Sequence, residues 1–216
     1  MKDEDFLPYT VPYSATDSDL EDNRLTYGQV DLGYNFLRRP RFDLGAFVGY
    51  FYMHERENAY GCTQTAGNPF ICGAFGGPID TNIRVISNEG DWNALRVGLS
   101  GDVAITDRLT LTANAAYLPY VDLSGEDTHV LQIGSDFIGP TDYDGEGDGY
   151  QLEAKLSYAI TGSFSLGLGA RYWHLKTDDG EFHFERSAFP IGLYDAQKVD
   201  FEIERVGGFI DVAYHF

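Results

Sequence analysis

The sequence predicts an all-β fold, an antiparallel transmembrane β-barrel that forms a single domain over residues 1–216. Three features predict it. Apolar and polar residues alternate over most of the chain, as they do in strands with two different faces. The alternating segments reach about ten residues, the length that a tilted strand needs to cross a bilayer. Tight turns also alternate with long polar connections, as in outer-membrane barrels.

Seven segments carry this alternation and form the predicted strands. In the first, Val30, Leu32 and Tyr34 share one face, whereas Asp31 and Gly33 share the other. A soluble sandwich or a lipocalin-like barrel would alternate in the same way. Aromatic residues near the strand ends, which resemble interfacial girdles, favour the membrane barrel. The predicted strands are 30–36, 44–52, 95–105, 109–117, 152–160, 164–172 and 210–216.

The connections between these strands are of two kinds. Three are tight turns, and the three long ones, at 56–90, 122–148 and 177–198, are polar and acidic. Short turns at one end and long loops at the other are typical of outer-membrane barrels. Charged residues on the predicted lumen face indicate ion pairs that fill a narrow barrel, with a transport path as the alternative. These residues are Arg96, Asp102, Glu153, Lys155, Arg171 and Asp211.

The strand count predicts that sequence is missing before Met1. The last strand must end on the periplasmic side, so seven strands place the beginning of the chain outside the cell. Single-chain bacterial barrels have an even number of strands and begin in the periplasm. We therefore expect one or three further strands before Met1, because of a misplaced start or a truncation. The first residues also lack the basic-then-apolar pattern of a signal peptide.

Composition and cysteines restrict the function further. The chain holds 34 acidic and 15 basic residues, a net charge of −19, which excludes a nucleic-acid binder held by charge. Aromatic residues make up 15%, too many for a disordered acidic tail. Cys62 and Cys72 flank a short polar segment, a spacing that suits a loop disulfide in an oxidising compartment; two free thiols are the alternative.

Two short motifs could carry chemistry. Asp3 and Asp5 lie two residues apart, and so do Asp127 and His129, so each pair shares a face of an extended segment. A carboxylate beside an imidazole raises its basicity and fixes its tautomer, and a facing carboxylate pair could hold a water between them. This arrangement suits attack of water on a peptide carbonyl. A chance Asp-x-His is nevertheless common in so acidic a chain.

The strand register presents a problem for the second motif. If strand 109–117 continued without interruption, its odd positions, which include Asp127 and His129, would face outward. A slip of one residue is required to turn them inward. Pro119 or Gly125 is the expected position of such a β-bulge.

These residues resemble those of the omptins, outer-membrane proteases of Gram-negative bacteria. The segment Met1 to Phe6 is similar to the family's Met-x-Asp-x-Asp-aromatic motif, and Tyr120 to His129 is similar to its block ending in Asp-x-His. Similarity covers most of the chain, including Gly49-Tyr50, Arg96 to Leu99 and the closing Tyr214-His215-Phe216. The family's barrel has ten strands, so the resemblance implies that three are missing here.

The resemblance implies an aspartic-type endopeptidase in the outer membrane, with its site facing the exterior and acting on cationic peptides. His129 would be the general base, oriented by Asp127, while Asp3 and Asp5 would position the attacking water. Glu126, next to the dyad, would contact the substrate. No cofactor is implied, although lipopolysaccharide, the expected lipid partner, could activate the enzyme. Acidic residues of the loop 122–148 would attract cationic peptides, or would merely keep the loop solvated or bind divalent cations.

Two other functions remain open at the level of sequence. A barrel of the same ancestry could be non-catalytic and act as an adhesin, a pore or a structural protein. A barrel enzyme that modifies lipid A is the third hypothesis. Asp142, Asp144, Glu146 and Asp148 also resemble a calcium loop faintly, but the complete ligand spacing is absent.

Overall fold

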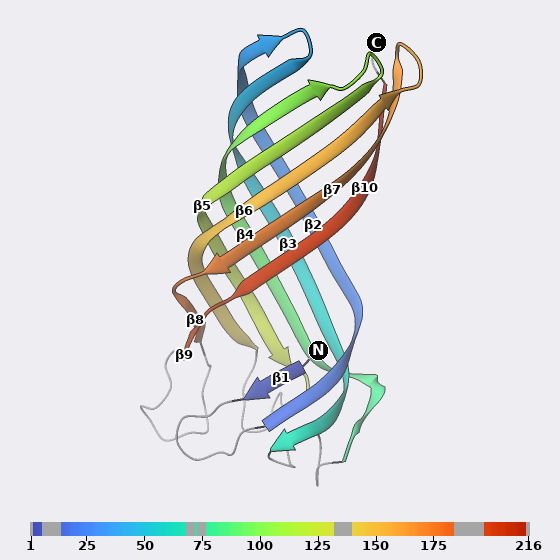
Figure 1. Ribbon diagram of the computed structural model, residues 1–216. Helices are drawn as coiled ribbons and strands as arrows, with labels where there is room; N and C mark the ends of the chain where they lie inside the picture. The colour runs from blue at the N-terminus through green and yellow to red at the C-terminus, as the bar shows by residue number, and fades with distance from the viewer. Residues whose placement is uncertain are drawn as a thin grey trace.

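A computed structural model shows an all-β protein whose sheet is curled into a half-barrel (Figure 1). It describes residues 2–5, 14–67, 72, 77–131, 140–183 and 197–214, and for residues 2–5, 14, 67 and 197 only the backbone. The seven predicted strands are all present, which confirms the predicted fold class. Seven long strands form the sheet: β2 (Ser14–Arg39), β3 (Phe42–Gly67), β4 (Ile79–Ala104), β5 (Leu109–His129), β6 (Thr141–Ala159), β7 (Phe164–Thr177) and β10 (Glu202–Tyr214).

The long strands are neighbours in chain order, and each pairs antiparallel with the next. Three short strands lie at the end opposite the tight turns: β1 (Lys2–Asp5) pairs with β2, and β8 (Gly180–His183) joins β6 to β9 (Gln197–Val199). The tight turns lie at the upper end of Figure 1. We call the opposite end, where β5 finishes, the mouth. No helix in the described part of the chain is long and apolar enough to span a membrane.

The strands extend much further toward the mouth than the sequence predicts. The segments 56–90, 122–148 and 177–198 are predicted as long loops, but β3 reaches Gly67 and β6 begins at Thr141. The prediction of long loops is therefore wrong over much of these segments. Part of their inner face is apolar and packs into a core, as Leu123 and Tyr143 do, and the strand pairing continues beyond the apolar outer surface.

The outer surface carries an apolar belt bounded by a tyrosine girdle. Leu32 is 80% exposed and Val206 81%, and both face away from the concave side. Toward the mouth, tyrosine hydroxyls donate hydrogen bonds to acids or amides on the neighbouring strand. A ring that buries its apolar face in lipid and bonds polar groups above it suits a membrane interface. The donors are Tyr50, Tyr52, Tyr117, Tyr120 and Tyr172, and the acceptors Asn93, Asp91, Asp148, Glu146 and Glu204, respectively.

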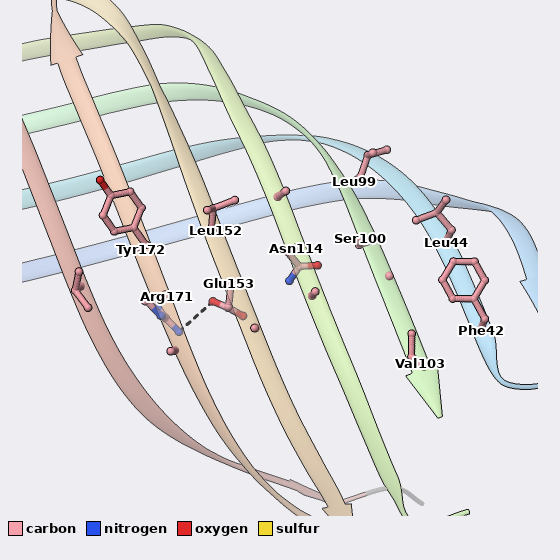
Figure 2. A pocket seen from close by; sticks show the side chains of 16 residues that line it. Phe42, Leu44, Leu99, Ser100, Val103, Asn114, Leu152, Glu153, Arg171 and Tyr172 are labelled. Atoms are coloured by element: carbon pink, nitrogen blue, oxygen red, sulfur yellow. Dashed lines mark ion pairs between the residues drawn. The ribbon is translucent and has the colours of Figure 1, made fainter. Parts of the chain in front are cut away.

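The inner face near the turns is polar. Of the six charges predicted there, five form ion pairs as predicted, and Asp102 instead accepts a hydrogen bond from the Thr112 hydroxyl. The Arg96 guanidinium lies 2.5 Å from a carboxylate oxygen of Asp31, and the Arg96 side chain is 5% exposed. Lys155 pairs with Asp211 at 3.1 Å. Figure 2 shows Arg171 of β7 pairing with Glu153 of β6, 3.4 Å apart. Two of these ion pairs reach across an intervening strand, β2 to β4 and β6 to β10, and together they fill this half of the lumen.

Closer to the mouth the inner face becomes an apolar core. Trp92 and Leu123 face each other across β4 and β5, and Phe51 packs its ring against Trp173 from the other side of the curled sheet. Burial of large side chains here replaces the ion pairs of the half near the turns. The cluster contains Phe47, Phe51, Met53, Trp92, Ala94, Ala116, Leu118, Val121, Leu123, Tyr143, Trp173 and Leu175.

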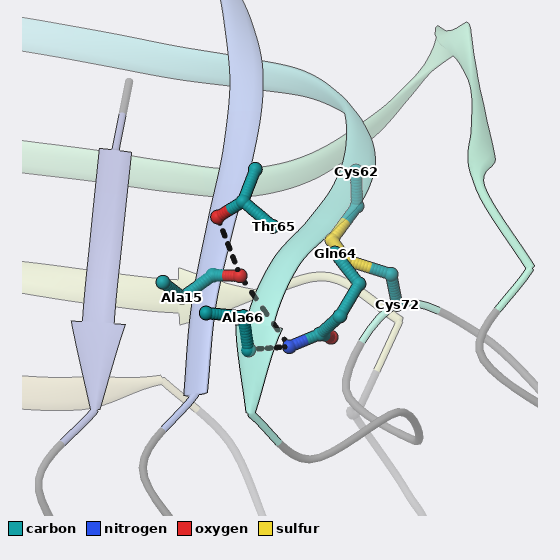
Figure 3. The surroundings of a disulfide bond; sticks show 6 residues. All are labelled: Ala15, Cys62, Gln64, Thr65, Ala66 and Cys72. Carbon is teal, nitrogen blue, oxygen red and sulfur yellow. Dashed lines mark hydrogen bonds between the residues drawn. A yellow bond between two sulfur atoms is a disulfide. The ribbon is translucent and has the colours of Figure 1, made fainter.

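Side-chain hydrogen bonds tie the end of β3 to β2, and a disulfide joins β3 to Cys72 beyond its end (Figure 3). Cys62 and Cys72 are bonded, with their Cα atoms 5.4 Å apart. The side chains of Gln64 and Thr65 both donate to the backbone carbonyl of Ala15. These two hydrogen bonds hold the segment of β2 that pairs with β1 at the mouth.

Candidate functional site

A register shift in β5 decides which side chains face the mouth. Up to Leu118 the buried positions of β5 are even, but Val121 and Leu123 are buried beyond it. The pairing of β5 with β6 shifts between Leu118 and Val121, at the position of Pro119. Proline cannot donate to the ladder, so it suits such an irregularity. The predicted slip is confirmed at Pro119, and it turns Asp127 and His129 to the inner face.

Asp127 and His129 form a hydrogen-bonded dyad at the end of β5. Nε2 of His129 lies 3.1 Å from Oδ2 of Asp127, and the two side chains are 42% and 17% exposed. The carboxylate is thus nearly buried while the imidazole remains accessible at the mouth. A neutral imidazole that donates from Nε2 carries its basic lone pair on Nδ1.

A buried tyrosine from the next strand lies beside the dyad. Tyr143 of β6 is 5% exposed and pairs with Gly125, two residues before Asp127 on the same face. Its hydroxyl donates to Oδ1 of Asn88 at 2.8 Å and lies 3.1 Å from the carbonyl oxygen of Glu89. Asn88 is the direct cross-strand partner of Asp127, so the phenol and the dyad meet at one residue of β4.

The environment of Tyr143 keeps its hydroxyl protonated. Tyr143 precedes the girdle residue Tyr150 on β6 and so lies outside the apolar belt. Burial raises the pKa of the Tyr143 hydroxyl above its ordinary value, and the carboxylates of Glu55 and Asp127 raise it further. The hydrogen bond to Asn88 acts in the opposite direction and is the smaller effect. At neutral pH the phenol is therefore a fixed donor.

Carboxylates outnumber cations on the opposite wall of the mouth. Glu55 accepts a hydrogen bond from the Trp92 indole, and Arg205 of β10 contacts Glu55 at 2.7 Å and Glu57 at 3.0 Å. The Arg205 guanidinium thus pairs with the two glutamates, and Asp127 is a third carboxylate at the mouth. The sequence analysis missed Asn88, Tyr143 and the ion-paired residues Glu55, Glu57 and Arg205. These residues lie on four different strands, and no short sequence motif contains them. Only the pairing register of the strands brings them close together.

The first predicted motif lies at the same end of the sheet as the dyad. The backbone of Asp3 and Asp5 belongs to β1, which pairs with β2 through Asp3↔Thr16 and Asp5↔Ser14. Figure 1 shows β1 at the mouth, where β5 also ends. The side chains of Asp3 and Asp5 are outside the described part of the chain, so the structure does not test whether they face the dyad.

Glu126, predicted to contact the substrate, lies on the opposite face of β5 from Asp127. It is exposed and accepts a hydrogen bond from the hydroxyl of Thr128. The acidic residues predicted to line a loop are likewise strand residues that alternate with the buried Tyr143 on β6. They therefore lie on the outer wall: Asp142, Asp144, Glu146 and Asp148. Within the described ranges, no group of three or more His, Cys, Asp or Glu residues is arranged to hold a metal ion.

Comparison with known proteins identifies the fold. No family model and no curated protein sequence matches the chain. Among solved structures, the outer membrane protease OmpT from Escherichia coli is similar, with a TM-score of 0.66 and 16% sequence identity. The match covers 100% of this chain and 73% of that protein. The curled antiparallel sheet described above is therefore an omptin-like fold, part of the arrangement seen in the OmpT β-barrel.

Proposed function

We propose that the protein is an outer-membrane endopeptidase that cleaves extracellular cationic peptides with an activated water. The hydrogen bond between Asp127 and His129, turned into the mouth by the shift at Pro119, is the observation that carries the proposal. Similarity of the fold to an outer membrane protease supports it. The apolar belt and tyrosine girdle support a position in a membrane, with the mouth on the exterior side.

In the proposed reaction His129 is the general base. Asp127 accepts from Nε2 and so holds the imidazole in the tautomer whose Nδ1 is basic. Nδ1 takes a proton from water as the water oxygen attacks the carbonyl carbon of the peptide. The proton then passes to the leaving amine nitrogen, which breaks the carbon–nitrogen bond. Asp3 and Asp5 would position the water, because their strand lies at the same end of the sheet.

The charge of the protein supports cationic substrates. The net charge is −19, and Glu55, Glu57 and Asp127 lie at the mouth with Arg205 as the cation that pairs with the two glutamates. Carboxylates that line a concave surface raise the local concentration of cationic ligands, and this attraction weakens with salt. We expect cleavage of lysine- and arginine-rich peptides to slow as the ionic strength rises.

Cleavage of a fluorogenic cationic peptide tests the proposal. The whole chain is refolded in detergent with lipopolysaccharide and compared with His129→Ala and Asp127→Asn. Loss of a positioned general base is expected to lower kcat/KM by about 10²–10⁴-fold. Circular dichroism and the heat-modifiable gel mobility verify that the variants fold like the wild type. Equal cleavage by all three proteins would remove the dyad from the mechanism, and cleavage by none would favour a non-catalytic barrel.

A further inference from the structure

The inner wall beside the dyad contains two paired glycines, and one aromatic ring lies across them. Gly90 of β4 and Gly125 of β5 are direct cross-strand partners on the inner face. A Cβ atom on Gly125 would lie 2.3 Å from Cζ of Tyr143, and one on Gly90 would lie 2.9 Å from its hydroxyl oxygen. The absence of both side chains therefore makes a flat recess, which the phenol ring of Tyr143 occupies.

The ring is held in this recess from its other side as well. Tyr143 stacks on Phe201 at a centroid distance of 4.8 Å and meets the edge of Phe182 at 5.5 Å. The two phenylalanines also contact each other at 5.3 Å. With its hydroxyl bonded to Asn88, Tyr143 is fixed by packing and by a hydrogen bond. A ring fixed on both faces does not move aside at low cost.

The recess adjoins the reacting groups of the proposed mechanism. Gly125 precedes Asp127 by two residues on the same face of β5, and Asn88 pairs with Asp127 across the ladder. In the proposed reaction, a residue next to the scissile bond would direct its side chain toward this wall, because the wall adjoins the dyad. The volume left beside Tyr143 then decides which side chain fits.

We propose that Tyr143 is a specificity-determining residue that fills this recess and restricts the adjoining substrate subsite to small side chains. The inference rests on the proposed endopeptidase function and adds its substrate class: cationic peptides cleaved beside glycine, alanine or serine. The carboxylates of the mouth attract the cationic peptide at long range. The phenol of Tyr143 then selects the substrate side chain next to the scissile bond by its size. One extra methylene in a tight pocket changes relative kcat/KM by about 10–200-fold.

A graded series at position 143 tests this inference. Wild type, Tyr143→Phe, Tyr143→Leu and Tyr143→Ala are assayed on cationic peptides that differ only at the residues flanking one bond: glycine, alanine, leucine, phenylalanine or arginine. Wild type and Tyr143→Phe should prefer small residues by at least about tenfold. The preference should shrink in Tyr143→Leu and disappear in Tyr143→Ala. Tyr143→Phe is the matched control, since it keeps the ring and removes only the hydroxyl.

The outcomes separate this inference from the proposed function. If cleavage depends on His129 but the profile of Tyr143→Ala matches that of the wild type, Tyr143 does not set specificity and the function stands. If no protein cleaves any peptide, the function fails and this inference fails with it. If Tyr143→Ala does not fold, two other results would still overturn the inference. One is a Tyr143→Leu profile identical to that of the wild type, and the other is a wild-type profile that favours bulky residues.

Discussion

The two halves of the inner face have the same alternating backbone but are filled by different means. Near the turns, charged side chains from different strands neutralise one another, as Arg96 of β4 and Asp31 of β2 do. Near the mouth, apolar side chains such as Trp92 and Leu123 form a floor, and the Asp127–His129 dyad stands at its edge. The ion-paired half near the turns supports the structure. The apolar half near the mouth lowers the local dielectric around carboxylates that outnumber the cations there. Chemistry is therefore expected only at the mouth.

The largest expected effect comes from breaking the ion-paired half. Asp31→Ala removes the partner of Arg96, whose side chain is 5% exposed, and leaves a buried charge uncompensated. We expect the free energy of unfolding to fall by about 3–5 kcal/mol, measured by denaturant titration in detergent. The double variant with Arg96→Met should recover most of this loss, because an apolar side chain of similar volume replaces the charge. If the double variant is as unstable as Asp31→Ala, the pair is not the cause.

The mouth half should instead respond to the loss of apolar volume. Leu123 is 1% exposed within the inner cluster, whereas Leu32 is 80% exposed on the outer belt. Leu123→Ala is expected to cost about 2–5 kcal/mol because it leaves a cavity. Leu32→Ala, the matched control, should change stability by only about 0.5 kcal/mol. Similar losses for the two variants in the same detergent would contradict the assignment of inner and outer faces.

The smallest expected effect is a dependence of stability on alkaline pH. Burial raises the pKa of Tyr143 above the ordinary value of 10.0, so the folded protein holds this proton more tightly than the unfolded chain. The stabilisation is complete below pH 10 and is lost as pH rises from there toward the folded pKa. The stability difference between wild type and Tyr143→Phe should therefore be constant below about pH 10 and change above it. A difference that stays flat through pH 11 would contradict a buried phenol.

Local pattern was sufficient to predict the strands, their faces and the paired charges. Period-two alternation identifies a strand wherever one side is apolar, so the segments 44–52 and 109–117 were found directly. The extension of β3 and β6 toward the mouth was missed. Tyr143 of β6 and Trp173 of β7 are buried on the inside, while Asp142 and Asp144 alternate with Tyr143 on the outside. From the sequence alone, this acidic start of β6 reads as a polar loop.

The site was predictable only in part, because its members are joined by register. Asp127 and His129 lie two residues apart in the sequence, and proline marks the shift that turns them inward. Asn88 and Tyr143 meet the dyad only through the β4–β5–β6 pairing, and Arg205 reaches Glu55 only because the sheet curls. These contacts depend on the sum of many ladder steps, so no short motif encodes them.

Cleavage assays of variants at the last four residues of β5 test the central claim most directly. Four variants are compared on one cationic peptide: Glu126→Gln and Thr128→Ala, on the outer face, and Asp127→Asn and His129→Ala, on the inner face. The register shift at Pro119 predicts alternation: the outer pair keeps wild-type kcat/KM, and the inner pair loses about 10²–10⁴-fold. Losses at the two outer positions with full activity at the inner ones would contradict the inward-facing dyad.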